Sequence, residues 1–130
     1  MQTAMNKEFH FTPDEIVSCR DRIISAFGLA KKAGKCVCGT SMCVDSIRSD
    51  TARLVIAASN LSDNTKKRLN DSCAFHKVEC IYLDCDMNYL GARLGIKNGT
   101  ACAALLDDGF VSIIRKLYSE VHTETMEVQQ

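Results

Sequence analysis

The chain has 130 residues, a length that suits a single domain with one hydrophobic core. Its formal net charge is 0, so no bulk positive charge marks a nucleic-acid-binding protein, and its 46% of hydrophobic residues is ordinary for a globular chain. No run of residues approaches the roughly 18 apolar positions that span a bilayer, and the first residues lack an apolar signal-peptide core. We therefore expect a cytoplasmic protein without membrane contact, whose eight cysteines are reduced thiols.

The first predicted element is a long helix. Residues 1–11 are expected to form a flexible N-terminus, after which Thr12 suits the N-cap and Pro13 the first helical position. Gly34 is well placed to end the helix after two lysines in its last turn. Its expected apolar face consists of Ile16, Cys19, Ile23, Ile24 and Phe27, which recur at helical spacing.

A strand, a helix and a second strand are predicted next. A short strand over residues 36–38 leads to Gly39, which opens a helix reaching about residue 49, with Thr40 or Ser41 as its cap. The run "RLVIAAS" at residues 53–59 is apolar without alternation and is bounded by polar residues. Such a run is typical of a strand buried on both faces.

The second half continues this alternation. Ser62 is expected to cap a helix within residues 61–77, and Gly95 to end a shorter helix over residues 86–95. Apolar runs at residues 78–84 and 100–106 are predicted strands. A last helix follows residues 107–109, and residues 120–130 are expected to form a flexible tail because apolar periodicity is lost there. The inward positions of the last helix are expected at Phe110, Ile113, Ile114 and Leu117.

The alternation of helices and strands predicts an α/β layer architecture in one domain over residues 12–119, with about four strands in a central sheet and helices on both faces. The charges along this chain are uneven. Residues 31–100 carry eleven basic and seven acidic side chains, whereas residues 101–130 carry two basic and five acidic ones. The middle of the chain is therefore where a contact surface for an anionic partner is expected.

The cysteines do not predict a metal site or a cofactor. Structural zinc sites use pairs with two residues between the ligands, whereas one residue separates Cys36 from Cys38 and four separate Cys80 from Cys85. A C-x-x-C redox pair is absent as well. Small apolar positions in strands and helices explain these residues more simply, because free cysteine packs well in a core. The cysteines expected there are Cys38, Cys73, Cys80 and Cys102.

Catalytic motifs are also missing, so we do not expect an enzyme. The sequence contains no G-x-S-x-G elbow, no Walker sequence and no G-x-G-x-x-G. His76 ends a predicted helix and is interpreted as a surface or capping residue rather than a base. Acidic residues at strand ends, such as Asp84 and Asp107, are explained by turns and caps more simply than by a magnesium site.

The stretch "GLAKKAGKCVCGTSMCVDSI" at residues 28–47 favours an RNA contact. It combines lysines at a helix end, a glycine turn and the N-terminus of a helix, each of which can hold phosphate groups. Glycine also lets a sugar-phosphate backbone approach closely. The alternative for this stretch is a solvated lysine cluster followed by an ordinary helix cap.

A family resemblance supports the first interpretation. The tract "LAKKAGKCVCG", the strand "LVIA" with the following "NTKKRL", and "LGARLG" resemble the kink-turn RNA-binding ribosomal protein superfamily of the large-subunit proteins seven-Ae and thirty-e. The bacterial YlxQ-type branch is the most similar, and the resemblance covers about residues 27–118. It implies a compact three-layer α/β/α sandwich with a central mixed sheet and a small protein that recognises structured, kink-turn-like RNA.

The resemblance also implies where RNA would bind. In this family the helix after the motif glycine, the loop after the second strand and the loop after the "LG---G" helix form the surface. The residues carried over, with three basic residues as added phosphate contacts, are Lys32, Lys35, Gly39, Thr40, Ser41, Ser59, Asn60, Leu61, Arg93, Ile96, Lys97 and Asn98, and the third loop runs on to Thr100.

The base-reading set of the family is largely missing from this chain. Family members that bind kink-turns best have asparagine, glutamate and lysine at positions where this chain has Ser41, Met42 and Asp45. Two functions therefore remain open. One is an RNA-binding protein whose partner is structured RNA, with ribosomal RNA and the ribosome as candidates. The other is a protein-interaction module that keeps the fold without RNA binding, for which the long N-terminal helix is a candidate contact.

Overall fold

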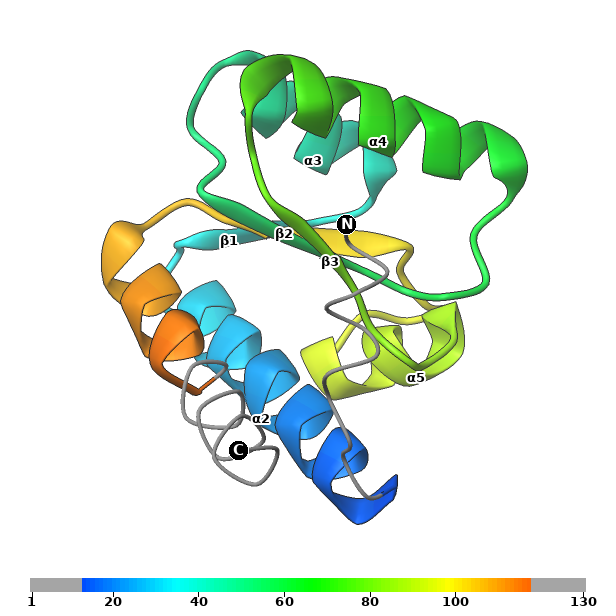
Figure 1. Ribbon diagram of the computed structural model, residues 1–130, viewed down its shortest axis with the longest axis vertical. Coiled ribbons are helices and arrows are strands. Elements are labelled where there is room, and N and C mark those ends of the chain that lie inside the picture. The colour runs from blue at the N-terminus through cyan, green and yellow to red at the C-terminus, as the bar shows by residue number, and fades with distance from the viewer. Residues whose placement is uncertain (1–12, 118–130) are drawn as a thin grey trace, which may run out of the picture.

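A four-stranded mixed sheet forms the middle layer of the protein in the computed structural model, which describes residues 13–117 (Figure 1). β4 runs antiparallel to both of its neighbours, β1 and β2, while β3 pairs with β2 in parallel. The spatial order is therefore β1-β4-β2-β3, with the last strand of the chain inside the sheet. The strands are β1 (Cys36–Cys38), β2 (Leu54–Ala57), β3 (Cys80–Tyr82) and β4 (Cys102–Leu105).

Helices cover both faces of this sheet. α3 (Thr40–Arg48) and α4 (Asp63–His76) lie on one face, and α2 (Pro13–Lys32), α5 (Met87–Leu94) and the helical residues 108–117 lie on the other (Figure 1). The expected three-layer α/β/α sandwich with a mixed sheet of four strands is confirmed. The predictions for Thr12 and for residues 1–11 and 120–130 lie outside the described residues.

The two inner strands explain the unbroken apolar runs in the sequence. Every residue of β2 and β4 is buried, because helices cover both sides of them. Leu54 and Ile56 belong to the core cluster under α2 and α5, whereas Val55 and Ala57 belong to the cluster under α3 and α4. The period of two along a strand thus divides one apolar run between two cores.

Two predicted helix ends are confirmed and one inward position is wrong. The Ser62 Oγ accepts a hydrogen bond from the Thr65 N–H at 3.2 Å, and Gly95 ends α5 in the left-handed conformation. Ile113 was expected to face the core, but its side chain is 51% exposed, while Val111 and Ile114 are buried. The buried stripe of this helix therefore includes residue 111, one turn before Ile114, instead of residue 113.

None of the helices within the described residues is long and apolar enough to cross a membrane.

A close backbone contact joins α5 to the loop that precedes β4. A Cβ atom on Gly91 would lie 2.4 Å from the Cα of Gly99, so only glycine at position 91 allows this approach. The N–H of Thr100 donates to the carbonyl of Met87 at 3.1 Å and holds the same loop against the start of α5. These contacts fix the path of residues 96–100.

We predict that Gly91→Ala lowers the free energy of unfolding by about 1–3 kcal/mol, because the added methyl group forces the two backbones apart. Urea unfolding followed by circular dichroism measures the change. Gly28→Ala is the matched control: Gly28 is also helical, and a Cβ there meets nothing within 4 Å. The free energy of unfolding of the control should rise by about 0.5–1 kcal/mol. An equal decrease in both variants would show that the contact between Gly91 and Gly99 is not the cause.

Candidate nucleic-acid interface

Three loops converge at one edge of the sheet because of the strand directions. The end of β1 pairs with the start of β4 (Cys38 with Ala103), and the end of β2 also meets the start of β4 (Ala57 with Cys102). The segments that follow β1, follow β2 and precede β4 therefore meet. We call this surface the loop edge, and it comprises residues 39–41, 59–61 and 96–100.

The first segment of the loop edge is the N-terminus of α3. Gly39 is its N-cap, with φ 97° and ψ 152°, and no side chain caps the helix, so the expectation that Thr40 or Ser41 caps it is wrong. The Gly39 N–H donates to the Cys102 carbonyl at 2.9 Å, and this bond fixes the turn before α3. The N-cap is therefore Gly39, which precedes both of the expected cap residues. The first N–H groups of α3 therefore have no side-chain acceptor and lie at the positive end of the helix dipole.

The second segment, residues 59–61, is tied to the rest of the fold by its polar side chains. Ser59 donates from both its N–H and its Oγ to the Cys85 carbonyl, at 2.8 and 3.0 Å. The Oδ1 of Asn60 accepts from the Met87 N–H at 2.9 Å, at the first turn of α5. Both residues are exposed, and Leu61 is half-buried against the core. This loop is thus held in one conformation while parts of both polar side chains stay accessible.

The third segment leads from α5 back to β4. Asn98 and Gly99 both have positive φ, 66° and 84°, which gives a tight left-handed turn. Lys97 and Asn98 are exposed at this turn, and Ile96 is half-buried against the core. Lys97 is the basic residue of the loop edge, so the described part of this surface has little positive side-chain charge.

The other predicted basic residues lie elsewhere. The carbonyl of Lys35 accepts from the Leu106 N–H at 2.8 Å, so Lys35 and the nearby Lys32 lie at the start of β1, the opposite end of that strand from Gly39. Arg93 lies on α5 against α2. The structure therefore brings together the nine predicted residues of the three loops and separates Lys32, Lys35 and Arg93 from them.

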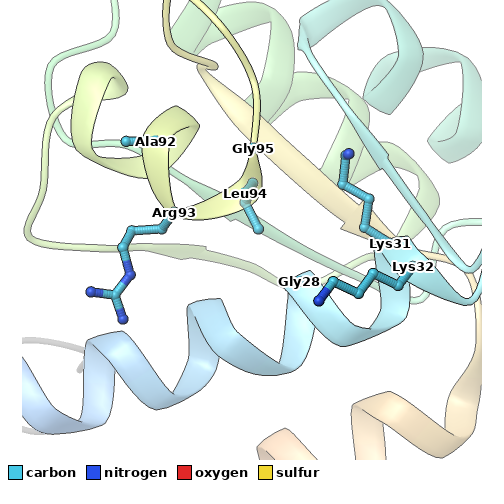
Figure 2. A pocket seen from close by; sticks show the side chains of 7 residues that line it. All are labelled: Gly28, Lys31, Lys32, Ala92, Arg93, Leu94 and Gly95. Carbon is cyan, nitrogen blue, oxygen red and sulfur yellow. The ribbon is translucent and has the colours of Figure 1, made fainter.

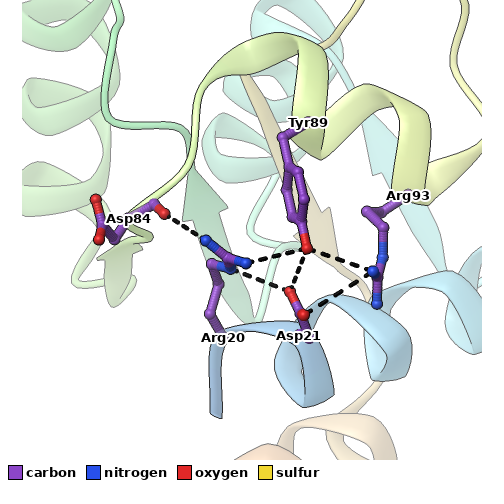
Figure 3. A network of polar contacts seen from close by, with 5 residues as sticks. All are labelled: Arg20, Asp21, Asp84, Tyr89 and Arg93. Carbon is purple, nitrogen blue, oxygen red and sulfur yellow. Dashed lines mark hydrogen bonds and ion pairs between the residues drawn. The ribbon is translucent and has the colours of Figure 1, made fainter. Parts of the chain in front are cut away.

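Arg93 belongs to a polar network between α2 and α5 that the sequence did not predict (Figure 3). The Tyr89 hydroxyl donates to Asp21 at 2.8 Å and accepts from Arg20 at 3.0 Å and from Arg93 at 3.3 Å. Arg20 also donates to the carbonyl of Asp84 at 2.8 Å. Its members come from two segments far apart in sequence, residues 20–21 and 84–93, and form no motif, so only the packing of α2 on α5 reveals them.

The network controls the charge of Asp21. Burial raises the pKa of the Asp21 carboxyl, but hydrogen bonds from Tyr89 and Arg20 and the charges of Arg20 and Arg93 outweigh burial, so its pKa is lowered overall. The ionised carboxylate in turn holds the two guanidinium groups beside the tyrosine ring, with Arg20 at 4.4 Å from the ring centroid.

A basic cleft lies beyond this network, between the ends of α2 and α5 (Figure 2). It encloses about 360 Å³ and is lined by Gly28, Lys31, Lys32, Ala92, Arg93, Leu94 and Gly95. Lys31 is a lining residue absent from the predicted set, although it stands beside Lys32 in the lysine-rich stretch and that stretch was the available signal.

Burial controls the charge of two of the thiols. All eight cysteines are free, and burial raises the pKa of Cys19 and of Cys85, which keeps both in the neutral thiol form. Within residues 13–117, no group of three or more histidine, cysteine or acidic side chains could hold a metal ion.

Comparisons with known proteins show a family match and two similar sequences. Residues 21–115 match the family described as ribosomal protein L7Ae/L30e/S12e/Gadd45. The RNA-binding protein YlxQ of Bacillus subtilis is 33% identical over 85 residues, which cover 65% of this chain and 83% of that protein. RNA-binding protein YlxQ of Enterococcus faecium is 34% identical over 64 residues, which cover 49% of this chain and 62% of that protein. These names are those of ribosomal and RNA-binding proteins, not of enzymes.

Solved structures show the same fold. A protein of unknown function from Bacillus halodurans superimposes with a TM-score of 0.65 at 26% identity, over 76% of this chain and 95% of the other. The Giardia lamblia 15.5kD RNA binding protein gives the same TM-score of 0.65 at 16% identity, over 88% of this chain and 92% of the other, and this match concerns the fold alone.

We predict that Asp21→Asn lowers the free energy of unfolding by about 1 kcal/mol at pH 7, because the two arginines lose their anionic partner. The pKa of Asp21 is lowered in the folded state, so its contribution is present above the ordinary value of 3.8 and is lost as the pH falls through the folded-state pKa. The difference between the variant and the natural chain should therefore shrink between pH 7 and pH 3 in urea titrations. Asp45→Asn, at an exposed position, is the control, and a pH-independent difference for Asp21→Asn would contradict the assignment.

Proposed function

This chain belongs to the ribosomal protein L7Ae/L30e/S12e/Gadd45 family, in its YlxQ-type branch, and on that premise we propose that it is a small RNA-binding protein that recognises structured, kink-turn-like RNA. Its contact surface is the loop edge. We further propose that it acts in the cytoplasm, with ribosomal RNA as the candidate partner.

The observation that carries this proposal is the uncapped N-terminus of α3 between two well-anchored loops. Unpaired N–H groups at a helix N-terminus donate hydrogen bonds to the oxygen atoms of a phosphate group, and Gly39 has no side chain that would hinder the approach of an RNA backbone. Ser59 and Asn60 are held by Cys85 and Met87, so the adjacent loop is preorganised and loses little entropy on binding.

The side chains of this surface favour weak or unusual RNA recognition. Ser41, Met42 and Asp45 are exposed on α3 at the positions where the family resemblance implies asparagine, glutamate and lysine. A hydroxyl and a thioether make fewer contacts to base edges, and a carboxylate repels phosphate. Backbone groups and shape therefore carry most of the proposed recognition.

We expect Ser41→Glu to abolish binding of a kink-turn RNA without unfolding the protein. A carboxylate in the first turn stabilises α3 through the helix dipole, by about 0.3–1 kcal/mol, but repels the phosphate proposed to lie there. Fluorescence anisotropy with a labelled kink-turn and thermal unfolding of the same sample measure both effects. Ser112→Glu makes the same change at an exposed position on the other layer and should leave binding unchanged.

The proposal is overturned if the natural chain shows no salt-dependent binding to the kink-turn or to total cellular RNA at low salt, or if Ser41→Glu binds as well as the natural chain.

A charge reversal in the second turn of α3 should strengthen binding. At about 4–6 Å and an effective dielectric constant near 20, a carboxylate beside a phosphate costs about 3–4 kcal/mol before salt screening. After a several-fold reduction for screening, we expect Asp45→Lys to raise the affinity for a simple kink-turn roughly tenfold. Asp108→Lys, which makes the same change at an exposed residue beyond the other end of β4, is the control. Equal affinities for the natural chain and Asp45→Lys would show that residue 45 does not meet RNA.

The second candidate function is a protein-interaction module that keeps the fold without RNA binding. The exposed Phe75, 81% accessible on α4, favours it, because aromatic side chains are enriched at protein interfaces. Binding of RNA that tolerates Phe75→Ala and fails in Ser41→Glu would favour the first function.

A further inference from the structure

The cleft between α2 and α5 has the charge of an anion-binding site. Three of its seven lining residues are cations, Lys31, Lys32 and Arg93, and none is acidic. Asp21 lies outside the lining, and of the three lining cations it pairs with Arg93, at 3.9 Å. No acidic residue of the lining pairs with either lysine, and their side chains extend in different directions from the end of α2 (Figure 2).

Gly28 lines the cleft, and the fold does not require glycine at this position. It lies inside α2, its φ is not positive, and a Cβ placed there would meet no other atom within 4 Å. A glycine in the middle of a helix weakens that helix relative to alanine. Neither backbone conformation nor packing explains this glycine, whereas close approach of a ligand backbone does.

The cleft also continues into the loop edge. Gly95 lines the cleft, and the chain then passes through the exposed Lys97 and Asn98 to Thr100 at the start of β4. The five steps along the chain from Gly95 to Thr100 span at most about 18 Å. Successive phosphates of one strand lie 3.4 Å apart along the axis in B-form DNA and closer together in an A-form RNA stem, so about five to seven base pairs cover this distance.

We propose that the cleft is a second phosphate-binding site, in which Lys31 and Lys32 hold the backbone of the RNA stem that flanks the motif bound at the loop edge. This inference rests on the proposed function. The loop edge, with Lys97, binds the bent part of the RNA, and the cleft binds the adjoining duplex by its charge alone. Gly28 allows the sugar-phosphate backbone to lie against α2.

The test compares two RNAs that share one kink-turn and differ in stem length. One carries a stem of about twelve base pairs on each side, and the other carries stems of about three, too short to reach the cleft. The variant Lys31→Gln/Lys32→Gln should bind the long-stem RNA about tenfold more weakly and lower its salt slope by about 2, while binding to the short-stem RNA stays unchanged. Lys77→Asn, in which asparagine suits the left-handed conformation at the end of α4, is the control and should change neither.

Gly28→Ala distinguishes an effect on binding in the cleft from an effect on the stability of the protein. It should raise the melting temperature of the protein and yet weaken binding of the long-stem RNA alone, because its methyl group projects into the cleft. Equal losses for both RNAs, or no loss for the lysine variant, overturns the second site. If the natural chain binds neither RNA, the proposed function itself fails, and that result is distinct from either of these.

Discussion

The position of β4 inside the sheet determines where the three loops of the proposed RNA-binding surface lie. This strand is the last in sequence, yet it lies between β1 and β2 and runs antiparallel to both. Because of this direction, the end of β1, the end of β2 and the start of β4 meet at one edge. A parallel β4 would carry the loop of residues 96–100 to the opposite edge, and the uncapped end of α3 would stand alone.

The insertion of β4 depends on small residues. The strand reads Cys102, Ala103, Ala104 and Leu105, and all four side chains are fully buried. Small side chains let α3 on one face and α2 on the other approach a central strand closely, and cysteine fills such a position much as alanine does. The same closeness recurs where Gly91 meets Gly99, so the loop before β4 is placed by glycine as well as by the sheet. Packing of this kind accounts for the buried thiol of Cys102.

Sequence patterns such as caps and apolar runs predicted the helices and strands well, but they could not predict which elements contact one another in the fold. The Ser62 cap, the Gly95 stop and the unbroken apolar runs each depend on neighbours in sequence, so the sequence alone revealed them. Gly39 as a cap depends on a bond to Cys102, sixty-three positions away, and the expectation of a side-chain cap failed for that reason. Lys32 and Lys35 are close to Gly39 in sequence, but β1 lies between them. The three residues of β1 therefore place the two lysines at the opposite end of the strand from Gly39. The network around Tyr89 is likewise a product of α2 packing on α5.

The lysine charges of the cleft and the helix N-terminus of the loop edge lie on different parts of the surface. At the loop edge, partial charges on the α3 N–H groups and one lysine face the proposed ligand, and dipoles of this kind release few counterions. The full charges of Lys31 and Lys32 lie in the cleft, at the far end of residues 95–100. In the proposed binding mode, geometry-dependent affinity arises at the loop edge and salt-dependent affinity arises in the cleft. A chain with a formal net charge of 0 can bind a polyanion by this division, because neither site needs the rest of the surface to be basic.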